Sequence, residues 1–450
     1  MPDLKRRVLR SGGWTFLGYG LSQALRMGGN LIMTRLLAPD MFGLMAIANM
    51  VMIGLAMFSD LGIRQSIVQS QRGDDETFLN TAWALQIVRG LAIGGVTLGL
   101  SLLVYAAAAV RWFPGDSVYS DSRLPAVLVA LSTCAAIAGF ESTTIAQASR
   151  RLSLAAVTML ELKSQILGLV CMMLWAYQDP SVWALVCGAI VAALGRCMLS
   201  HVTLDGIRNR WQWNREALTE LASFGRWIFL SSILGFLVNN ADRLILGGLV
   251  SSEILGVYTV AFLLINAVES VLVKVMGDIA YPAFSETIRE RSDRIKDIFY
   301  KFHLSIGGLS FLLAGVIYAL GPTIVLVLYD TRYADAGWML RVLAIGLALL
   351  PYRIAALCLM ALGHPKVLTF LTGLRLIALF VLCPVTHSYF GLQGVLWTFA
   401  LSAVAGLPVL WRYQWTSGIF DARRELIVWP FLGLGLFLGF GVVRIIGGVV

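Results

Sequence analysis

Apolar stretches long enough to cross a bilayer follow one another along almost the whole of this 450-residue chain. A helix of about 20 apolar residues spans the ~30 Å hydrocarbon core of a membrane. Hydrophobic residues make up 58% of the sequence and charged residues 14%, against about 25% in soluble domains. The sequence therefore predicts an all-α integral membrane protein. The expected spans are 12–36, 42–66, 80–108, 124–147, 154–176, 180–204, 222–249, 254–281, 302–329, 335–361, 366–388, 391–413 and 427–446.

The distribution of lysine and arginine gives these spans a direction. If the N-terminus lies in the cytosol, the loops on that side carry twenty lysines and arginines, and the outer loops of the first twelve spans carry four. Cytosolic loops are enriched in basic residues, so this contrast predicts a multi-pass protein with a cytosolic N-terminus. The net charge of +9 follows the same pattern. We therefore expect no nucleic-acid partner.

Two short segments resemble each other at about half the chain length. LLAPDMFGLMAIA (36–48) follows the first span, and LVSSEILGVYTVA (249–261) follows the seventh. Aligning Gly43 with Gly256 sets an offset of 213 residues. An even number of spans returns the chain to the same side, so we predict two six-helix bundles in a parallel repeat. The predicted domains are an N-terminal lobe at 1–204, a cytosolic amphipathic linker at 205–221, a C-terminal lobe at 222–415 and an additional transmembrane segment at 416–450.

Three segments outside the twelve-span scheme carry their own expectations. The linker 205–221 is polar and helix-prone, with two tryptophans among arginines that suit the headgroup level. Residues 284–301 are expected to extend a helix into the cytosol. The Gly-rich span 427–446 is either a peripheral thirteenth helix or the first half of a hairpin.

Cations inside the predicted spans are the strongest functional signal. Each costs roughly 2.5–3.5 kcal/mol to insert at a helix centre, and we set only five acids against ten cations. This excess predicts a polar interior that receives an anionic cargo. The cations are Arg26, Arg89, Lys163, Arg196, Arg226, Arg243, Lys274, Arg341, Arg353 and Arg375, and the acids are Glu141, Glu161, Asp242, Glu269 and Asp278.

Arginine suits such a cargo because its planar guanidinium binds phosphate bidentately and never loses its charge. Any single arginine could instead pair structurally or extend toward the headgroups. The polar cluster at 239–243 could equally be a clamp between helices. The candidate substrate-binding residues are Arg26, Asn30, Arg89, Arg226, Asn239, Asn240, Arg243, Arg341, Arg353 and Arg375.

Some embedded acids could couple transport to a cation. Such an acid could be protonated, pair with an arginine, or bind H⁺ or Na⁺. Asp242 and Arg243 are adjacent in sequence and therefore point about 100° apart, so we expect no face-to-face pair. Lys274 and Asp278 are four residues apart and are expected to compensate each other locally. The candidate coupling residues are Glu141, Asp242 and Glu269.

Signals for metal, cofactor or catalytic chemistry are weak. The six cysteines form no CxxC pair, and the four histidines are scattered, so we expect no metal site, disulfide or cofactor. The acidic run DDE (74–76) could hold a metal for glycosyl transfer, but a solvated loop is the simpler interpretation. The longest outer loop, 109–123, contains no histidine. The sequence thus favours a transporter over an enzyme.

Four stretches together resemble the polysaccharide transporter family, the Wzx-type oligosaccharide flippases of the multidrug/oligosaccharidyl-lipid/polysaccharide exporter superfamily. They are RLLAPDMFGLMAIANMVMIGLAMFSDLGIRQSIVQ (35–69), NNADRLILGGLVSSEILGVYTVAFLL (239–264), YPAFSE (281–286) and YADAGWMLRVLAI (333–345). The resemblance covers roughly 12–415 and is nearest to the colanic-acid and teichuronic-acid type exporters. It implies two six-helix bundles in a V around a central cavity, in the bacterial inner membrane. It also implies that cavity arginines meet a pyrophosphate.

The resulting hypothesis is a flippase for polyprenyl-pyrophosphate-linked oligosaccharides, working by alternating access in extracellular or capsular polysaccharide synthesis. Its expected partners are that lipid-linked cargo, membrane lipids, H⁺ or Na⁺, and polysaccharide polymerase machinery. One alternative is a cation-coupled drug or metabolite exporter of the same superfamily, whose pocket should be acidic. The other is an integral membrane enzyme of polysaccharide assembly. The sequence does not identify the sugar.

Overall fold

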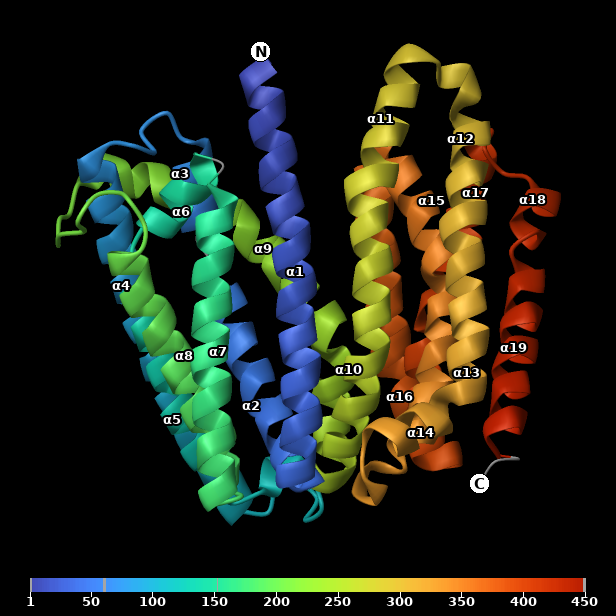
Figure 1. Cartoon of the computed structure of the whole chain (residues 1–450), viewed down its shortest axis with the longest axis horizontal. Helices are drawn as coiled ribbons and strands as arrows, with labels where there is room; N and C mark the ends of the chain where they lie inside the picture. The colour runs from blue at the N-terminus through green and yellow to red at the C-terminus, as the bar shows by residue number, and fades with distance from the viewer. Residues whose placement is uncertain (1, 60–61, 152, 448–450) are drawn as a thin grey trace. The chain divides into compact units, whose positions relative to one another are not determined.

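A computed structural model describes residues 2–59, 62–151 and 153–447, with side chains left out at 2–17, 19, 222–231, 292, 365, 446 and 447. These residues form helices joined by short connections, and the described ranges contain no strand (Figure 1). The helices are α1 (Pro2–Leu36), α2 (Pro39–Phe58), α3 (Ile63–Gln69), α4 (Glu76–Ala109), α5 (Leu124–Gly139), α6 (Thr144–Arg150), α7 (Leu154–Gln178), α8 (Val182–Val202), α9 (Arg215–Leu249), α10 (Ser252–Val275), α11 (Tyr281–Glu290), α12 (Ile295–Phe302), α13 (Gly308–Leu328), α14 (Ala336–Ala344), α15 (Leu350–Ala361), α16 (Pro365–Leu401), α17 (Leu407–Thr416), α18 (Ala422–Leu426) and α19 (Trp429–Gly447).

The predicted all-α membrane fold is confirmed. Nine helical segments in the described part of the chain are long and apolar enough to cross a membrane, or ten if the bent pair α5–α6 counts as one span. The predicted spans 366–388 and 391–413 lie in one helical stretch of 51 residues, Lys366–Thr416. A kink at Gly391, with φ of 58°, divides that stretch. The division into six plus six spans stays a prediction.

The chain forms two compact units, residues 1–256 and 257–450. In the first unit, α7 packs on α8 and on α1, α4 packs on α5, and α9 packs on α2. In the second unit, α13 packs on α14 and α19. The predicted lobes 1–204 and 222–415, the linker 205–221 and the segment 416–450 stay predictions.

The two copies of the predicted repeat touch each other at equivalent positions within the first unit. A Cβ atom added to Gly43 would lie 1.8 Å from the carbonyl oxygen of Ser252. A Cβ atom added to Gly256 would lie 1.7 Å from the carbonyl oxygen of Pro39. The offset of 213 residues converts one contact into the other, because it relates Pro39 to Ser252 and Gly43 to Gly256. This reciprocal contact supports the predicted alignment, and it requires glycine on both sides.

The linker differs from the expected helix. Helix α9 begins at Arg215, and residues 205–214 are not helical. Backbone N–H groups in this segment are instead satisfied by side chains of α4: Arg210 N donates to Asn80 Oδ1 at 2.9 Å, and Asn214 N donates to Thr81 Oγ1 at 3.2 Å. These tertiary bonds replace the helical hydrogen bonds that its composition suggested.

The C-terminal span proves to be closely packed within the second unit. Helix α19 lies along α13, where a Cβ atom on Gly315 would be 2.5 Å from the carbonyl oxygen of Leu432. A Cβ atom on Gly435 would be 2.2 Å from the carbonyl oxygen of Leu312. Small residues allow such close approach of membrane helices, so α19 is tightly joined to the helix beside it.

Candidate functional site

In the first unit, one candidate membrane span is bent, and another span is followed by a short separate helix. The chain bends by 58° between α5 and α6. Helix α2 ends at Phe58, and α3 begins at Ile63 after Gly62 in the left-handed region, with φ of 61°. Breaks at membrane depth expose backbone polar groups and are tolerated where other groups or a wet cavity satisfy them. The two breaks therefore mark a place to look for a site.

Side chains of neighbouring helices satisfy the backbone at the α5–α6 break. Gln86 of α4 donates from Nε2 to the carbonyl oxygens of Ala138 at 3.0 Å and Glu141 at 3.1 Å. The N–H group of Ser142 donates to Ser200 Oγ of α8 at 2.9 Å. These hydrogen bonds stabilise the bend between α5 and α6.

Arg89 of α4 occupies the end of α2. Its Nη2 donates to the carbonyl oxygen of Ala56 at 2.6 Å, and its Nε donates to Ser59 Oγ at 3.2 Å. A cation at a helix C-terminus binds the last carbonyl groups and is stabilised by the helix dipole. This capping fixes the guanidinium of Arg89 at the second break.

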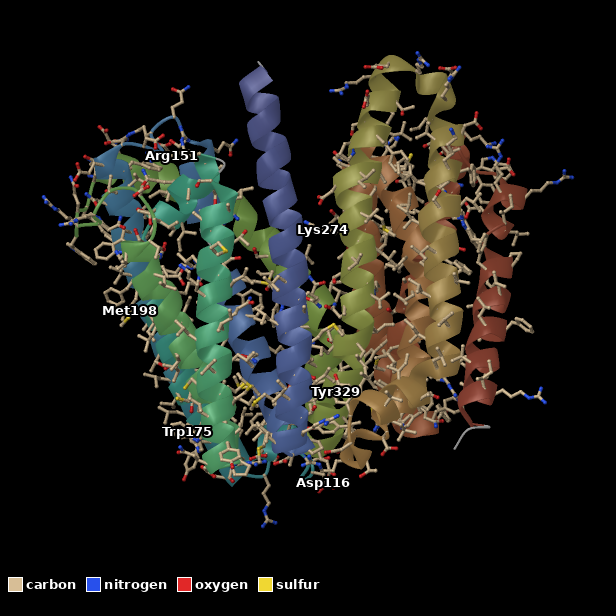
Figure 2. All side chains as sticks on the ribbon, viewed as in Figure 1. Asp116, Arg151, Trp175, Met198, Lys274 and Tyr329 are labelled. Carbon is tan, nitrogen blue, oxygen red and sulfur yellow. The ribbon has the colours of Figure 1, made fainter. Side chains whose placement is uncertain are left out.

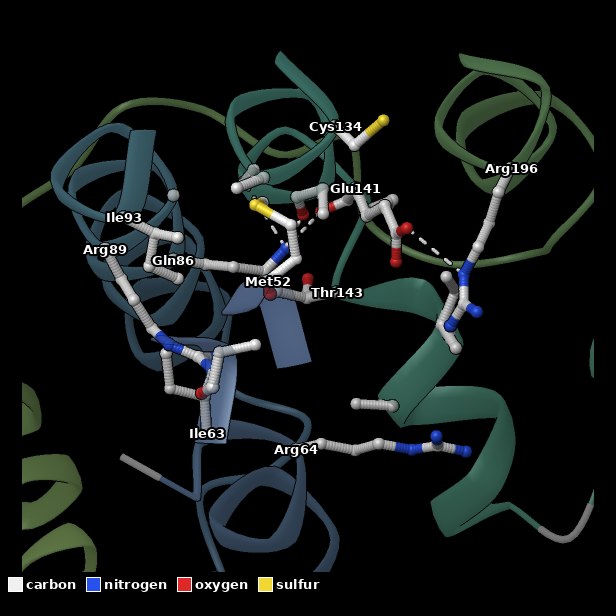
Figure 3. A pocket seen from close by; sticks show the side chains of 18 of the residues that line it. Met52, Ile63, Arg64, Gln86, Arg89, Ile93, Cys134, Glu141, Thr143 and Arg196 are labelled. Carbon is white, nitrogen blue, oxygen red and sulfur yellow. Dashed lines mark hydrogen bonds and ion pairs between the residues drawn. The ribbon is translucent and has the colours of Figure 1, made fainter. Parts of the chain in front are cut away.

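Between the two breaks lies a cavity of about 430 Å³ (Figure 3). Its volume is within the range of roughly 300–1,000 Å³ typical of small-molecule sites. Apolar side chains such as Ile93 and Met52 share its wall with polar ones. The charged and amide residues on that wall are Arg64, Gln86, Arg89, Glu141 and Arg196.

The cavity wall carries a positive balance of charge. Glu141 pairs with Arg196, whose Nε lies 3.1 Å from Glu141 Oε1, with side chains 16% and 36% exposed. Arg64 is an exposed residue whose Nη2 donates to Ser149 Oγ at 3.0 Å. Three arginines and one carboxylate therefore line this cavity, and Arg196 is the arginine that pairs with the carboxylate. Such a basic, partly dehydrated wall attracts anions.

Of the predicted site residues, two line this cavity: Arg89 and Glu141. Arg64, Arg196 and Gln86 were missed as site residues. Arg196 stood among the embedded cations, and Arg64 was counted as a charge of the first predicted cytosolic loop. The helix break that brings them together was not recognised, although Gly62 and the polar run Glu141–Thr143 interrupt the apolar pattern there.

The predicted residues on α1 and α9 whose side chains are described are not among those that line this cavity. Arg26 is exposed, and Asn30 is half-buried. The side chain of Arg226 lies outside the described residues. Asn239 is exposed, whereas Asn240 is buried and donates to the carbonyl oxygen of Phe236 at 3.1 Å.

Asp242 and Arg243 are closer than their sequence adjacency suggested. Arg243 Nη1 lies 3.9 Å from Asp242 Oδ1, and the side chains are 17% and 13% exposed. The expectation of no pair was wrong because the long arginine side chain can fold back across the helix surface. Neither residue stands as an isolated charge.

Three predicted arginines of the second unit have other partners. Arg341 Nε donates to the carbonyl oxygen of Tyr318 at 3.0 Å. In a regular helix that carbonyl would accept from residue 322, but Pro322 has no N–H group. Arg341 thus satisfies the carbonyl that the proline leaves open. Arg375 Nε donates to Ser402 Oγ at 2.9 Å.

The predicted coupling residue Glu269 pairs with Arg353. Their closest atoms, Oε1 and Nη1, are 3.3 Å apart, and the side chains are 37% and 53% exposed. Pairing with an arginine was one of the alternatives for Glu269. The predicted local pair Lys274–Asp278 is present at 3.3 Å.

The acidic run at 74–76 belongs to a network of ion pairs. Asp74 pairs with Arg150 at 3.1 Å and Arg151 at 2.9 Å, and Asp75 caps α4 through the N–H of Thr77 at 3.1 Å. The hydrogen bond from Arg151, with that from Arg150, holds the pKa of Asp74 below its ordinary value. Figure 2 places Arg151 and Asp116 at opposite ends of the first unit, as the predicted topology requires.

Comparisons with known proteins identify the family of this chain. A sequence profile described as polysaccharide biosynthesis protein matches residues 32–337. The succinoglycan biosynthesis transport protein ExoT of Rhizobium meliloti (strain 1021) is 22% identical over 345 residues, which cover 77% of this chain and 67% of ExoT. The lipopolysaccharide biosynthesis protein WzxC of Escherichia coli (strain K12) is 21% identical over 311 residues, which cover 69% of this chain and 60% of WzxC.

Solved structures share the fold at low sequence identity. The lipid II flippase MurJ in an inward closed conformation gives a TM-score of 0.68 at 10% identity, covering 96% of this chain and 92% of that one. An inward-facing multidrug resistance MATE family transporter of the MOP superfamily gives 0.64 at 16% identity, covering 88% and 94%. These findings confirm the predicted resemblance. The candidate membrane spans make this chain a multi-pass membrane protein. Because the profile matches more than half of this chain's length, the chain belongs to the polysaccharide biosynthesis protein family.

Proposed function

We propose that this protein is a flippase that moves polyprenyl-pyrophosphate-linked oligosaccharides from the cytosolic to the outer leaflet of the bacterial inner membrane. Membership of the polysaccharide biosynthesis family supports this, as does the similarity to a succinoglycan transport protein. The observation that carries the proposal is the cavity of the first unit, where Arg64, Arg89 and Arg196 meet around one space.

The cavity suits the charged part of such a cargo. At about 430 Å³ it can take a diphosphate with an adjoining sugar, and the polyprenyl chain would stay in lipid. Arg64 and Arg89 would bind phosphate oxygens, because guanidinium groups bind them with charge-assisted hydrogen bonds. Gln86 Oε1 and the hydroxyl proton of Thr143, on the same wall, would be the hydrogen-bonding groups for a sugar, since Gln86 Nε2 and Thr143 Oγ1 already have protein partners.

The proposed role of the second unit is structural support and movement. Its arginines at 341, 353 and 375 already bind a carbonyl, a carboxylate and a hydroxyl. The anion is assigned instead to Arg64, Arg89 and Arg196, because these three arginines, which also have protein partners, line one cavity. Rocking of the two bundles would then expose the head group outside, as in other alternating-access transporters.

The membrane potential favours this direction of transport. It is worth about 2.3 kcal/mol per charge per 100 mV, and the cell interior is negative, so a diphosphate is driven outward. Glu141 is the remaining coupling candidate on the cavity wall. In this scheme, a proton on Glu141 would release Arg196 from its 3.1 Å pair and free it for the anion.

A flipping assay in proteoliposomes tests the proposal. Protein is reconstituted with a fluorescent polyprenyl-diphosphate oligosaccharide, and the fraction that becomes accessible to an external enzyme is measured. We expect Arg64→Gln/Arg89→Gln to remove most of the flipping while the protein stays folded. Unchanged flipping by that variant would disprove the role of the cavity.

The second candidate is a cation-coupled exporter, because MATE transporters share the fold. A pocket for organic cations should be acidic, whereas this cavity holds three arginines and one glutamate. We therefore expect no uptake of cationic dyes by inverted vesicles containing the protein. Robust dye transport that is lost in Glu141→Gln would favour the exporter instead.

A further inference from the structure

A buried histidine and a buried glutamate face each other in the second unit. His303 lies where α12 passes into α13, and its side chain is 2% exposed. Glu425 lies on α18, and its side chain is 8% exposed. His303 Nε2 is 3.7 Å from Glu425 Oε2, which is longer than a hydrogen bond. The comparisons and the proposed cavity assign no role to this pair.

Only one oxygen of Glu425 has hydrogen-bond donors. Tyr300 Oη lies 3.2 Å from Oε1 and 3.3 Å from the carbonyl oxygen of Asp421, so its one proton serves either acceptor, and Gln414 Nε2 approaches Oε1 at 3.4 Å. Four buried atoms of the cluster have no hydrogen-bond partner among the described residues: both ring nitrogens of His303, Oε1 of Gln414 and Oε2 of Glu425. Buried polar atoms usually have a hydrogen-bond partner. This cluster therefore lacks the hydrogen bonds that would satisfy these four atoms.

Counting donors and acceptors shows what is missing. With neutral His303 and ionised Glu425, these four atoms offer one N–H donor to three acceptors. One added proton gives two donors and two acceptors, whether it sits on the imidazole or on the carboxyl group. A second proton would give three donors and one acceptor. Only the state with a single added proton is balanced, with bonds made directly or through a buried water.

We propose that His303 and Glu425 together bind one exchangeable proton, and that this proton ties α18 to the α12–α13 helix. Loss of the proton leaves a buried carboxylate beside two further unpaired acceptors, which is costly in a low-dielectric interior. The proton therefore stabilises the end of the unit from which α19 departs. This inference does not depend on the cargo proposed for the cavity of the first unit.

A pocket in the second unit is lined by one direct neighbour of the pair. This pocket of about 590 Å³ is lined by Tyr300, together with Arg294 and Lys301. The hydroxyl group of Tyr300 contacts both this cluster and the backbone N–H of Asp421, which donates to it at 2.8 Å. A proton from the pocket thus needs to pass only one side chain to reach Glu425.

Other ionisable groups near the pair come from α12, α15 and α18. Hydrogen bonding from the N–H of Arg424, helped by Lys296, holds the pKa of Asp421 below its ordinary value. Tyrosine hydroxyls titrate near pH 10 or above. These groups are Tyr300 of α12 and Tyr352 of α15, with Asp421 and Arg424 at α18, which pair in turn with Lys296 and Asp297 of α12.

Spectroscopy of the intact protein can show whether the pair of His303 and Glu425 holds one proton. The chain has only four histidines, so ¹⁵N-histidine NMR of the labelled protein can be assigned with His303→Gln. Infrared difference spectra between wild type and Glu425→Gln report a protonated carboxyl group. At pH 7 we expect one signature only: imidazolium at His303 or a carboxylic acid at Glu425. Finding neither signature, or both together, would overturn the proposal.

Thermal unfolding supplies an independent readout. The Glu425→Gln amide brings its own N–H donors, so this variant should fold without the proton. Between pH 6 and 9 the midpoint of unfolding should fall more in wild type than in Glu425→Gln. His364→Gln, at an exposed histidine of the same unit, is the matched control and should behave as wild type. Equal pH dependence of wild type and Glu425→Gln would contradict the proposed site.

Discussion

Embedded arginines serve different purposes in the two units. In the first unit, Arg64, Arg89 and Arg196 converge on one cavity between two broken helices. In the second unit, Arg341 and Arg353 lie apart and bind a backbone carbonyl and a carboxylate. In the proposed function, arginine would therefore be a binding group in the first unit and a structural group in the second. What decides between them is whether the backbone beside the arginine is broken around a space.

The largest expected effect concerns anion binding. Arg64→Gln/Arg89→Gln should weaken binding of a polyprenyl-diphosphate probe by about 100-fold or more, since each hydrogen bond to a charged group contributes about 1.5–3 kcal/mol. Arg353→Gln/Arg375→Gln removes the same charge from the second unit and should change affinity by less than about threefold. Tryptophan fluorescence titration of the purified proteins measures both. Equal losses of affinity in the two double variants would contradict the proposed difference between the units.

The next effect tests the ion pair on the cavity wall. Arg196→Gln leaves Glu141 without its cation, and breaking a fully buried pair costs roughly 3–5 kcal/mol. Because Arg196 is 36% exposed, we expect about 2 kcal/mol, seen as a lower midpoint of thermal unfolding in detergent. Glu141→Gln/Arg196→Gln should recover most of that stability. If the double variant is as unstable as the single one, the pair is not the cause.

A smaller effect is expected at Arg341. Arg341→Leu leaves the carbonyl oxygen of Tyr318 unsatisfied and should cost about 1–2 kcal/mol without weakening anion binding. Pro322→Ala restores an N–H group that can donate to the same carbonyl. The cost of Arg341→Leu should therefore shrink in the Pro322→Ala background, as a double-mutant cycle in thermal unfolding would show. Additive costs would refute the proline-compensating role.

The smallest effect is expected at Arg353. Its pair with Glu269 is about half exposed, and exposed pairs contribute roughly 0.2–1 kcal/mol. Arg353→Gln should shift the unfolding midpoint only slightly, and flipping should persist. A large loss of flipping by Arg353→Gln, with unchanged thermal stability, would indicate that arginines of the second unit also bind the cargo.

Helix positions and the family could be predicted from the sequence because apolar runs and basic loops follow directly from bilayer physics. Glu141 and Arg89 were also predicted as functional residues. Their meeting place could not be, because it depends on the 58° break between α5 and α6, which a run of apolar residues does not reveal. Likewise, the role of Arg341 required knowing that it reaches a carbonyl 23 residues earlier in the chain.

The linker shows a second limit of prediction from the sequence. Residues 205–214 have a composition compatible with a helix. Two of their backbone N–H groups instead donate to the side chains of Asn80 and Thr81 of α4. Local propensity is a weak guide when distant side chains compete for the backbone. Long-range partners of this kind leave no signal in the segment itself.

The reciprocal contact of Gly43 and Gly256 has a bearing on how such a chain arose. A patch that meets its own duplicate is self-complementary, the property of a two-fold homodimer interface. A half-length ancestor with one such helix start would pair with itself through this patch, and gene fusion would keep the pairing without a second surface having to evolve. A side chain at either glycine would clash with the main chain of the other segment, so neither position accepts a larger residue while the contact is kept.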